Sequence, residues 1–414
     1  MMYFKEPIAF ERGEGHYLYD VEGRQYLDFF GGIVTVSVGH CNPDVTEKVV
    51  NQYRTLQHTS TLFPNRQIVN LAEKLAEITP GRLQQSFFTS SGSEANETAV
   101  MLAKTYTGRS EMLALRHSYS GRTALAQSLC GTGTWRINEP NATSVKHAHN
   151  AYCYRCPFGK EYPSCDMQCV TDVKELIATT TGGEIAGMIA EPIQGVGGFI
   201  TPPKEYFKEL IKIIHDAGGV FIADQVQTGW GRTGGKWFGI QQWGVEPDMI
   251  TSAKGMANGL PIGWTIATPE VASSIKKGIH LATFGGNPVT TTGAMATIEY
   301  IEKHDLLTNA TETGAYLRNQ LEGLQERHPI IGDVRGMGLM QAMEFVTDRK
   351  TKEPAIPQTQ QILEALKDEG LLMGKGGLHG NVIRMSPPLT IGKTEVDDAI
   401  GRVDRALTKA VTAK

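Results

Sequence analysis

Two polar residues follow apolar stretches of this sequence, and their types suggest one reaction site. Asp224 ends the stretch Gly219–Asp224, and Lys254 stands thirty positions later, after Met249–Ala253. A buried carboxylate is costly unless a cation meets it. A lysine at a strand end is either solvated or a desolvated amine with a lowered pKa. Since a desolvated amine can form an imine with a carbonyl, the pair indicates carbonyl chemistry beside a buried carboxylate.

A third motif could hold a phosphate group. Ser91, Gly92 and Ser93 follow an apolar stretch, and a helical pattern opens at Glu94. Backbone N–H groups at a helix start favour anions, and glycine lets a ligand approach the backbone closely. A serine-rich helix cap without any ligand is the alternative, because such caps are common.

A glycine-rich segment matches a dinucleotide-binding pattern only in part. Gly229, Gly231 and Gly234 form a G-x-G-x-x-G motif directly after the stretch that ends at Asp224. A nicotinamide-binding fold needs a helix at the third glycine and an acidic residue about 20 positions further on. More glycines follow instead, and Pro247 interrupts. We therefore expect a turn, with a nicotinamide-dependent oxidoreductase as a distant alternative.

The elements that must position these motifs alternate along the middle of the chain. Continuous apolar strands between helices predict a mostly parallel sheet covered on both faces. The carboxyl ends of its strands would carry the motifs, and open α/β sheets bind ligands there. The expected strands are Ser86–Ser90, Glu111–Leu115, Ile185–Ile193, Gly219–Asp224, Met249–Ala253 and Gly263–Thr268, and the expected helices are Glu94–Thr107, Lys204–Ala217 and Pro269–Lys277.

The pattern changes after about residue 295. A long helical stretch, Thr297–Glu326, is followed by an apolar segment, a helix at Thr359–Glu369 and a strand at Asn381–Met385. This arrangement predicts a second, smaller α+β domain.

One cofactor uses all three motifs at the sheet edge, namely pyridoxal 5′-phosphate. Its phosphate suits the helix start at Gly92, its aldehyde suits Lys254, and its pyridine nitrogen suits Asp224. The protonated ring would be the cation that meets the buried carboxylate. That pairing would keep the ring positively charged, so that it withdraws electrons from a substrate.

Composition and charge exclude several classes of protein. The chain has 414 residues, with 40% hydrophobic and 20% charged residues and a net charge of −4. These values are typical of a globular protein and give no support for a nucleic acid or membrane partner. No apolar run could span a bilayer, and Glu6, Glu11 and Glu14 argue against a transit peptide. We expect a cytoplasmic protein, and six cysteines suit a reducing compartment.

The whole chain resembles the class III, fold-type I pyridoxal-phosphate aminotransferases. The blocks SSGSEANE, AEPIQGVGG, FIADQVQTGWGRTGG, PDMITSAKGMANGLPIG, TFGGNPV, GDVRGMGL and IRMSPPLTI are similar to family motifs and stand in family order. The opening segment is similar to the alanine–glyoxylate aminotransferase type 2 group. The resemblance implies an α/β large domain with a mostly parallel seven-stranded sheet at 49–294. A segment at 1–48 would join a small α+β domain at 295–414.

The resemblance also implies a role for each matching residue. Lys254 would carry the cofactor as a Schiff base and move a proton, Asp224 would pair with the pyridinium, and Glu191 would help to position the ring. Arg384 would bind the substrate carboxylate through its guanidinium. The implied cofactor-binding residues are Ser91, Gly92, Ser93, Tyr119, Asp224, Val226, Gln227, Lys254 and Thr283.

Thr283 would reach the cofactor phosphate of a neighbouring subunit, which implies a homodimer or a tetramer built from dimers. Three positions depart from the family pattern: Gln225 replaces a glutamate, Ser120 replaces a common histidine, and Val196 replaces a glutamate found in many members. We interpret the first two as changes outside the direct cofactor contacts. The third bears on the choice of substrate.

The predicted function is ping-pong transfer of an amino group from alanine or a short β-amino acid to glyoxylate or pyruvate. Two alternatives keep the same cofactor. One is an ornithine or 4-aminobutyrate type ω-aminotransferase that uses 2-oxoglutarate, and the other is a racemase or aminomutase of the same fold.

Four cysteines leave a structural zinc site open. Cys153, Cys156, Cys165 and Cys169 have the spacing C-x2-C-x8-C-x3-C, which could bind zinc. The intervening loop is short, and the family resemblance needs no metal, so free thiols in a surface segment are the prediction.

Overall fold

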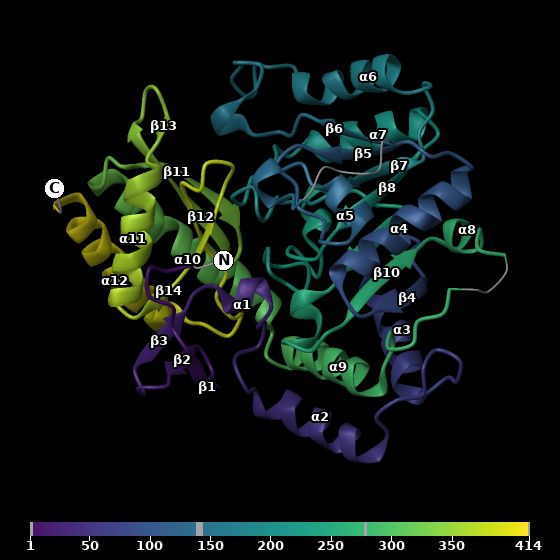
Figure 1. The fold of residues 1–414 in the computed structure, drawn as a ribbon, viewed down its shortest axis with the longest axis horizontal. Helices are drawn as coiled ribbons and strands as arrows, with labels where there is room; N and C mark the ends of the chain where they lie inside the picture. The colour runs from purple at the N-terminus through teal and green to yellow at the C-terminus, as the bar shows by residue number, and fades with distance from the viewer. Residues whose placement is uncertain (1–2, 138–143, 277–279, 413–414) are drawn as a thin grey trace.

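A seven-stranded sheet forms the centre of the larger part of the molecule (Figure 1). The computed structural model describes residues 3–137, 144–276 and 280–412. The strand order is β4-β10-β9-β8-β7-β5-β6, and all neighbours are parallel except β10, which runs antiparallel to β4 and β9. The strands are β4 (Gln85–Thr89), β5 (Met112–Leu115), β6 (Val145–Ala148), β7 (Gly187–Ala190), β8 (Val220–Asp224), β9 (Met249–Ser252) and β10 (Gly263–Ala267).

The central strands are buried along their whole length because helices cover the sheet. Every residue of β7, β8 and β9 is buried, which explains their continuous apolar sequences. Helix α4 (Gly92–Thr107) packs on β9 and β10, α7 (Tyr206–Asp216) packs on β8, and α6 (Gln168–Thr180) packs on α7 and β6. The shorter α5 (Ala124–Leu129) and α8 (Pro269–Ala272) contact α4.

The smaller part combines both ends of the chain. One sheet has the order β11-β12-β16-β15 with β13 on β12, and another has the order β1-β2-β3-β14. Since β14 pairs in parallel with β3, N-terminal and C-terminal residues share a sheet. The strands are β1 (Phe10–Glu14), β2 (Tyr17–Asp20), β3 (Gln25–Asp28), β11 (Ile331–Met337), β12 (Met340–Asp348), β13 (Glu353–Pro354), β14 (Leu371–Leu372), β15 (Gly374–Gly376) and β16 (Val382–Met385).

Several helices connect or cover these parts. Helix α2 (Pro43–Thr55) and α3 (Arg66–Ile78) pack against α9 (Pro288–Lys303), while α11 (Ile356–Asp368) packs against α12 (Lys393–Thr412). The domain limits predicted at residues 48 and 294 fall inside α2 and α9, and the division stays a prediction.

Three local predictions differ from the structure. The long helix expected at Thr297–Glu326 is two helices, α9 and α10 (Leu306–Arg327), because Asp305 adopts a left-handed backbone with φ of 48°. The helix expected at Pro269–Lys277 is the short α8, and Lys277 lies outside the described residues. Strand β6 was not predicted, since its sequence VKHA lacks a continuous apolar run.

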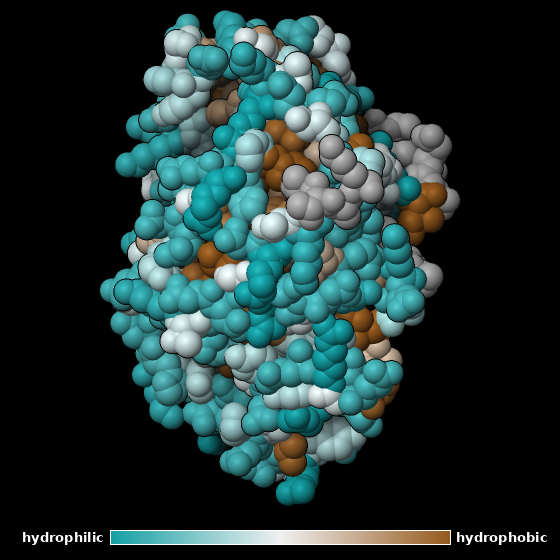
Figure 2. Space-filling model, turned by 90° about the vertical axis from the view of Figure 1, so that its left-hand side faces the viewer, coloured by the Kyte–Doolittle hydropathy of each residue, from teal (hydrophilic) through white to brown (hydrophobic). Residues whose placement is uncertain are grey.

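The surface over the smaller part is largely hydrophilic, with small scattered hydrophobic patches (Figure 2). Among the described residues, no helix has both the length and the apolar character needed to cross a bilayer.

Candidate active site

A cavity of about 140 Å³ opens where β7, β8 and β9 end. Most of the residues predicted for the site line it together, from elements that are far apart in the sequence. Its lining includes Gly92, Ser93, Tyr119, Glu191, Asp224, Val226, Gln227 and Lys254, with Asn96, Ser120, Gly121, Arg122 and Ala253 in addition.

Asp224 lies at the end of β8 with 3% of its surface exposed. Its Oδ1 accepts a hydrogen bond from the N–H of Val226 at 2.9 Å, and its Oδ2 accepts one from Asn96 Nδ2 at 2.9 Å. Burial raises the pKa of Asp224, whereas these two donors and Lys254 lower it. No cation of the described residues lies within ion-pair distance. The carboxylate can therefore accept a cationic group from the cavity.

Asn96 is a site residue that sequence reasoning missed. Besides Asp224, its Nδ2 contacts the carbonyl oxygen of Ser120 at 2.9 Å, and its Oδ1 accepts from Thr251 Oγ1 at 2.6 Å. These bonds fix the amide so that one N–H points at the carboxylate. The signal was its position four residues after Gly92, which places both on one face of α4.

Lys254 follows β9 and begins a short 3₁₀ helix, Lys254–Ala257. Its φ of 44° is uncommon for a residue other than glycine, and such strained backbone clusters at functional sites. Burial lowers the pKa of Lys254 to about 8, although Asp224 and Glu191 oppose the shift. A substantial fraction of the amine is therefore neutral, and hence nucleophilic, near physiological pH.

Glu191 lies directly after β7 and connects two segments of the site. Its Oε1 accepts the N–H of Tyr119 at 3.1 Å, and its Oε2 accepts the N–H of Gly195 at 2.8 Å. Burial, together with the nearby Asp224, raises the pKa of Glu191 to about 8. Its carboxyl group thus positions the backbone that carries Tyr119 and the loop after β7.

The helix start of α4 lies at the cavity, where the sequence predicted phosphate binding, but Ser91, Gly92 and Ser93 differ in position. Gly92 and Ser93 line the cavity, whereas Ser91 does not. Ser91 Oγ accepts the N–H of Glu94 at 3.3 Å and thereby caps the helix. A Cβ at Gly92 would lie only 3.2 Å from Val226 Cγ2, so a larger residue would crowd this wall.

Two further residues predicted to contact the cofactor, Gln227 and Tyr119, also line the cavity. Gln227 Oε1 is buried and has no hydrogen-bond partner, and a Cβ at Gly195 would lie 2.4 Å from this side chain. The ring of Tyr119 stands edge-on to Trp135 at 5.6 Å. A ligand in the cavity would supply the missing partner of Gln227.

Arg384 lies on β16 outside the cavity lining, with 3% of its surface exposed. Its Nη1 donates to the carbonyl of Gly195 and its Nη2 to that of Lys375, both at 2.9 Å. Its Nε is buried without a partner, and the guanidinium lies 5.4 Å from the rings of both Phe30 and Phe199. Its charge lowers the pKa of Lys254, which indicates that the two cations are near enough to interact electrostatically.

Val196 stands in the loop after β7, next in sequence to Gly195, whose carbonyl accepts from Arg384 Nη1. Its side chain is buried, and its carbonyl accepts the N–H of Gly377 at 2.9 Å. Valine offers no charge to the arginine, and no carboxylate of the described residues lies within ion-pair distance of Arg384.

Thr283 lies away from the cavity that contains Lys254. It is exposed and lines a separate hollow with Ser90, Glu94 and Thr98. Arg122, which sequence reasoning also missed, does line the cofactor cavity, and its backbone N–H donates to Ser93 Oγ at 3.2 Å. The signal for Arg122 was its place three residues after Tyr119 in a glycine-containing turn.

The two remaining departures from the family pattern have local roles. Gln225 Oε1 accepts from Thr228 Oγ1 at 2.6 Å and from the N–H of Gly239 at 2.9 Å, so it fixes the glycine-rich turn. Ser120 contributes its carbonyl oxygen to Asn96. No helix opens at Gly234, and a Cβ there would lie 2.8 Å from Thr311 Oγ1, so the G-x-G-x-x-G segment is a packed turn.

The four cysteines face one small hollow, and all are free thiols. Within the described part of the chain, no three histidine, cysteine or acidic side chains converge in a way that could hold a metal ion.

The residues of the cavity fit pyridoxal phosphate. A buried carboxylate without an ion pair, an amine with a lowered pKa, a helix start and an unpartnered amide oxygen surround one hollow. The carboxylate suits the ring nitrogen of the cofactor, the amine suits its aldehyde, the helix start suits its phosphate, and the amide suits its phenolic oxygen.

Comparisons with known proteins agree with this chemistry. The family model Aminotransferase class-III matches residues 3–407. Alanine–glyoxylate aminotransferase 2 homolog 2, mitochondrial, from Arabidopsis thaliana is 43% identical over 98% of this chain and 84% of that protein. Alanine–glyoxylate aminotransferase 2, mitochondrial, from Homo sapiens is 38% identical over 98% and 83%. A leucine/methionine racemase from Thermococcus litoralis is 38% identical over 97% and 90%.

Solved structures share the whole fold. A Bacillus anthracis aminotransferase superposes with a TM-score of 0.93 at 32% identity, covering 98% of this chain and 94% of the other. An amine transaminase from an uncultivated Pseudomonas species, solved in its PLP-bound form, gives 0.92 at 32% identity, covering 98% and 95%. The chain belongs to the class III aminotransferases, and it is an α/β transaminase that uses pyridoxal phosphate.

Proposed function

We propose that this transaminase moves the amino group of alanine or a short β-amino acid to glyoxylate or pyruvate in a ping-pong reaction. The observation that carries the proposal is the buried guanidinium of Arg384, which contacts two carbonyl oxygens but no carboxylate of the described residues. A substrate carboxylate would supply the missing charge. The names of the relatives from Arabidopsis thaliana and Homo sapiens support the same donor and acceptor.

Each residue of the cavity would have one task in this reaction. When bound, pyridoxal phosphate supplies an aldehyde that carries the amino group and a ring that withdraws electrons. Lys254 Nζ would hold the cofactor covalently and later take the proton from the substrate Cα. Asp224 would pair with the ring nitrogen, with Asn96 holding the carboxylate in place. Gly92 and Ser93 would receive the phosphate at the start of α4.

Val196 supports donors whose carboxylate lies close to the amine. A glutamate at this position could pair with Arg384 when a donor offers no carboxylate there, and valine cannot. A donor that leaves the buried arginine unpaired forgoes a charge-assisted hydrogen bond worth about 1.5–3 kcal/mol. Ornithine, reacting at its distant amine, and 4-aminobutyrate should therefore be poor donors.

The test is kcat/KM for alanine against ornithine and 4-aminobutyrate, in the wild type and in Val196→Glu. We expect the wild type to prefer alanine by roughly tenfold or more, and the variant to shift toward ornithine. Val196→Leu is the matched control, since it changes size without charge. Preference of the wild type for ornithine, or an unchanged ratio in Val196→Glu, would contradict the proposal.

A racemase is the second candidate, because a leucine/methionine racemase is among the relatives. Lys254 and Asp224 could serve both reactions. The two are separated by incubating the enzyme with L-alanine and glyoxylate. A transaminase forms equal amounts of pyruvate and glycine, whereas a racemase forms D-alanine without needing an acceptor.

A homodimer is part of the proposal. The side chains of Leu62, Phe63, Leu281 and Phe284 are each more than 60% exposed. Their two segments lie side by side, since the N–H of Thr61 approaches the carbonyl of Ala282 at 3.5 Å. An exposed apolar area of this kind favours an interface, and Thr283 lies within it. Burial against a second copy would bring Thr283 to the partner's cofactor.

The dimer predicts that dissociation and cofactor loss are coupled. The measurement is light scattering with cofactor absorbance along a dilution series, for the wild type and for Phe284→Asp. The charged variant should be monomeric and should lose the cofactor. A fully active monomer would contradict this part of the proposal.

A further inference from the structure

A second cavity, of about 230 Å³, lies where β5 and β6 end. β5 is followed by Arg116 and His117, and β6 is followed by His149. The facing wall comes from the smaller part of the molecule and includes Glu344 on β12 and His379 between β15 and β16. None of these residues lines the cofactor cavity. The carboxyl ends of parallel strands are where open α/β sheets bind ligands.

The lining of this cavity contains nitrogen atoms that no described residue satisfies. Arg155 Nη2 and His117 Nδ1 are buried and have no hydrogen-bond partner in the described part of the chain. The Arg116 side chain is exposed, and no acidic group of the described residues pairs with it. Burial, and after it the nearby His379 and Arg116, lowers the pKa of His117, so this ring favours its neutral form, in which one ring nitrogen can still donate a hydrogen bond. An anion in the cavity would offer acceptors to these groups and a counter-charge to Arg116.

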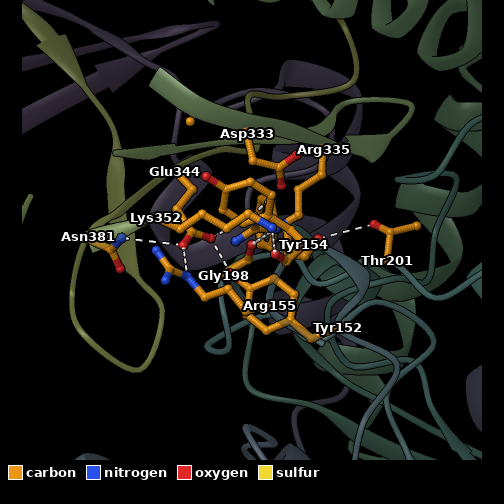
Figure 3. A network of polar contacts seen from close by, with 12 residues as sticks. Tyr152, Tyr154, Arg155, Gly198, Thr201, Asp333, Arg335, Glu344, Lys352 and Asn381 are labelled. Carbon is orange, nitrogen blue, oxygen red and sulfur yellow. Dashed lines mark hydrogen bonds and ion pairs between the residues drawn. The ribbon is translucent and has the colours of Figure 1, made fainter. Parts of the chain in front are cut away.

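The acidic group in the wall is already balanced. Glu344 Oε1 accepts from Arg155 Nε at 2.5 Å, and its Oε2 accepts from Arg335 Nη1 at 2.7 Å and from the hydroxyl of Tyr152. Arg335 Nη1 also contacts Asp333 at 2.6 Å, as Figure 3 shows. Two guanidinium groups therefore offset two carboxylates in this network. Among the described residues of the lining, the charge of Arg116 is left without a counterpart.

We propose that this cavity binds a phosphate dianion, either inorganic phosphate or the phosphate group of a small phosphomonoester. Arg116, Arg155 and His117 would donate from the larger part of the molecule, and His379 would donate from the smaller part. A tetrahedral dianion accepts hydrogen bonds from several directions, whereas a carboxylate presents one planar edge. The bound anion would therefore bridge the two parts.

The test is isothermal titration of the cofactor-saturated wild type with inorganic phosphate and, separately, with glycerol 3-phosphate. Cofactor saturation keeps phosphate out of the cup at α4, and unchanged cofactor absorbance confirms it. We expect one binding site per chain and a rise in melting temperature with phosphate concentration. The tighter of the two ligands identifies the source of the dianion.

Two variants assign the binding to this cavity. Arg116→Gln and His379→Asn, both at exposed positions, should each weaken phosphate binding roughly tenfold, as expected for loss of one charge-assisted contact. Arg116→Lys should restore part of the affinity. Arg82→Gln, at a side chain that is 69% exposed and distant in the fold, is the control and should bind like the wild type. Absence of binding of either ligand to the wild type, or equal affinity in all variants, would overturn the proposal.

Discussion

Lys254 is half-buried in the cofactor cavity and Arg384 is buried outside its lining, and the surroundings of these two cations differ. Asp224 and Glu191 lie near enough to Lys254 to raise its pKa, but burial outweighs both and lowers the pKa of this lysine to about 8. Arg384 instead contacts backbone carbonyls and aromatic rings, and no carboxylate in the described part of the chain lies within ion-pair distance. The cofactor end of the site thus places acidic groups near its amine without forming an ion pair among the described residues. The substrate end leaves one charge for the substrate to satisfy.

The largest expected effect comes from removing the amine of the cofactor end. Lys254→Ala should abolish covalent capture of the cofactor and reduce turnover by a factor on the order of 10⁴ or more, because no second lysine lines the described cavity. Stopped-flow absorbance and steady-state turnover measure the two effects. Normal turnover in this variant would contradict the role of Lys254 and, with it, the distinction between the cofactor end and the substrate end of the site.

Asp224→Asn should retain the cofactor but lower kcat by roughly 10²–10³, since the ring would lose the carboxylate that keeps it protonated. Cofactor content by absorbance, measured beside kcat, separates binding from chemistry. Asn96→Ala, which removes a donor to Asp224 rather than the charge, is the matched smaller change and should cost about tenfold. A wild-type kcat in Asp224→Asn would contradict the role of the carboxylate.

Arg384→Gln tests the substrate end. It should raise KM for both alanine and the acceptor by roughly 10–100-fold while cofactor content stays normal, because the lost contact is a charge-assisted pair. If cofactor content fell and KM did not change, the arginine would belong to the cofactor end instead.

The pH dependence of cofactor capture should be a smaller effect. The pKa of Lys254 in the cofactor-free protein is lowered by burial to about 8, so its amine is mostly protonated at pH 7 and mostly neutral at pH 9. The rate of capture should rise about tenfold between these values and level off above them. Because the folded state disfavours the charged amine, the cofactor-free protein should also gain stability as pH rises from about 8 to about 10.5.

Local patterns predicted the sheet and placed Asp224 and Lys254 at strand ends, whereas the other predicted residues of the cavity lining, such as Glu191, came from the family resemblance. Buried parallel strands appear as continuous apolar runs, and their end residues follow directly, as in Asp224 after Val220–Ala223. Asn96 and Arg122 were missed because their roles depend on contacts between distant segments. Ser91 was predicted as a cofactor contact, but its side chain caps α4, and residue type alone does not distinguish these two uses.

The most direct test of the account is to identify the lysine that holds the cofactor. Borohydride reduction of the loaded enzyme, followed by proteolysis and mass spectrometry, locates the attachment. We predict the mass of the reduced cofactor on the peptide that contains Lys254, with no adduct in Lys254→Ala. An adduct on another lysine, or a loaded and active enzyme without any adduct, would contradict the account.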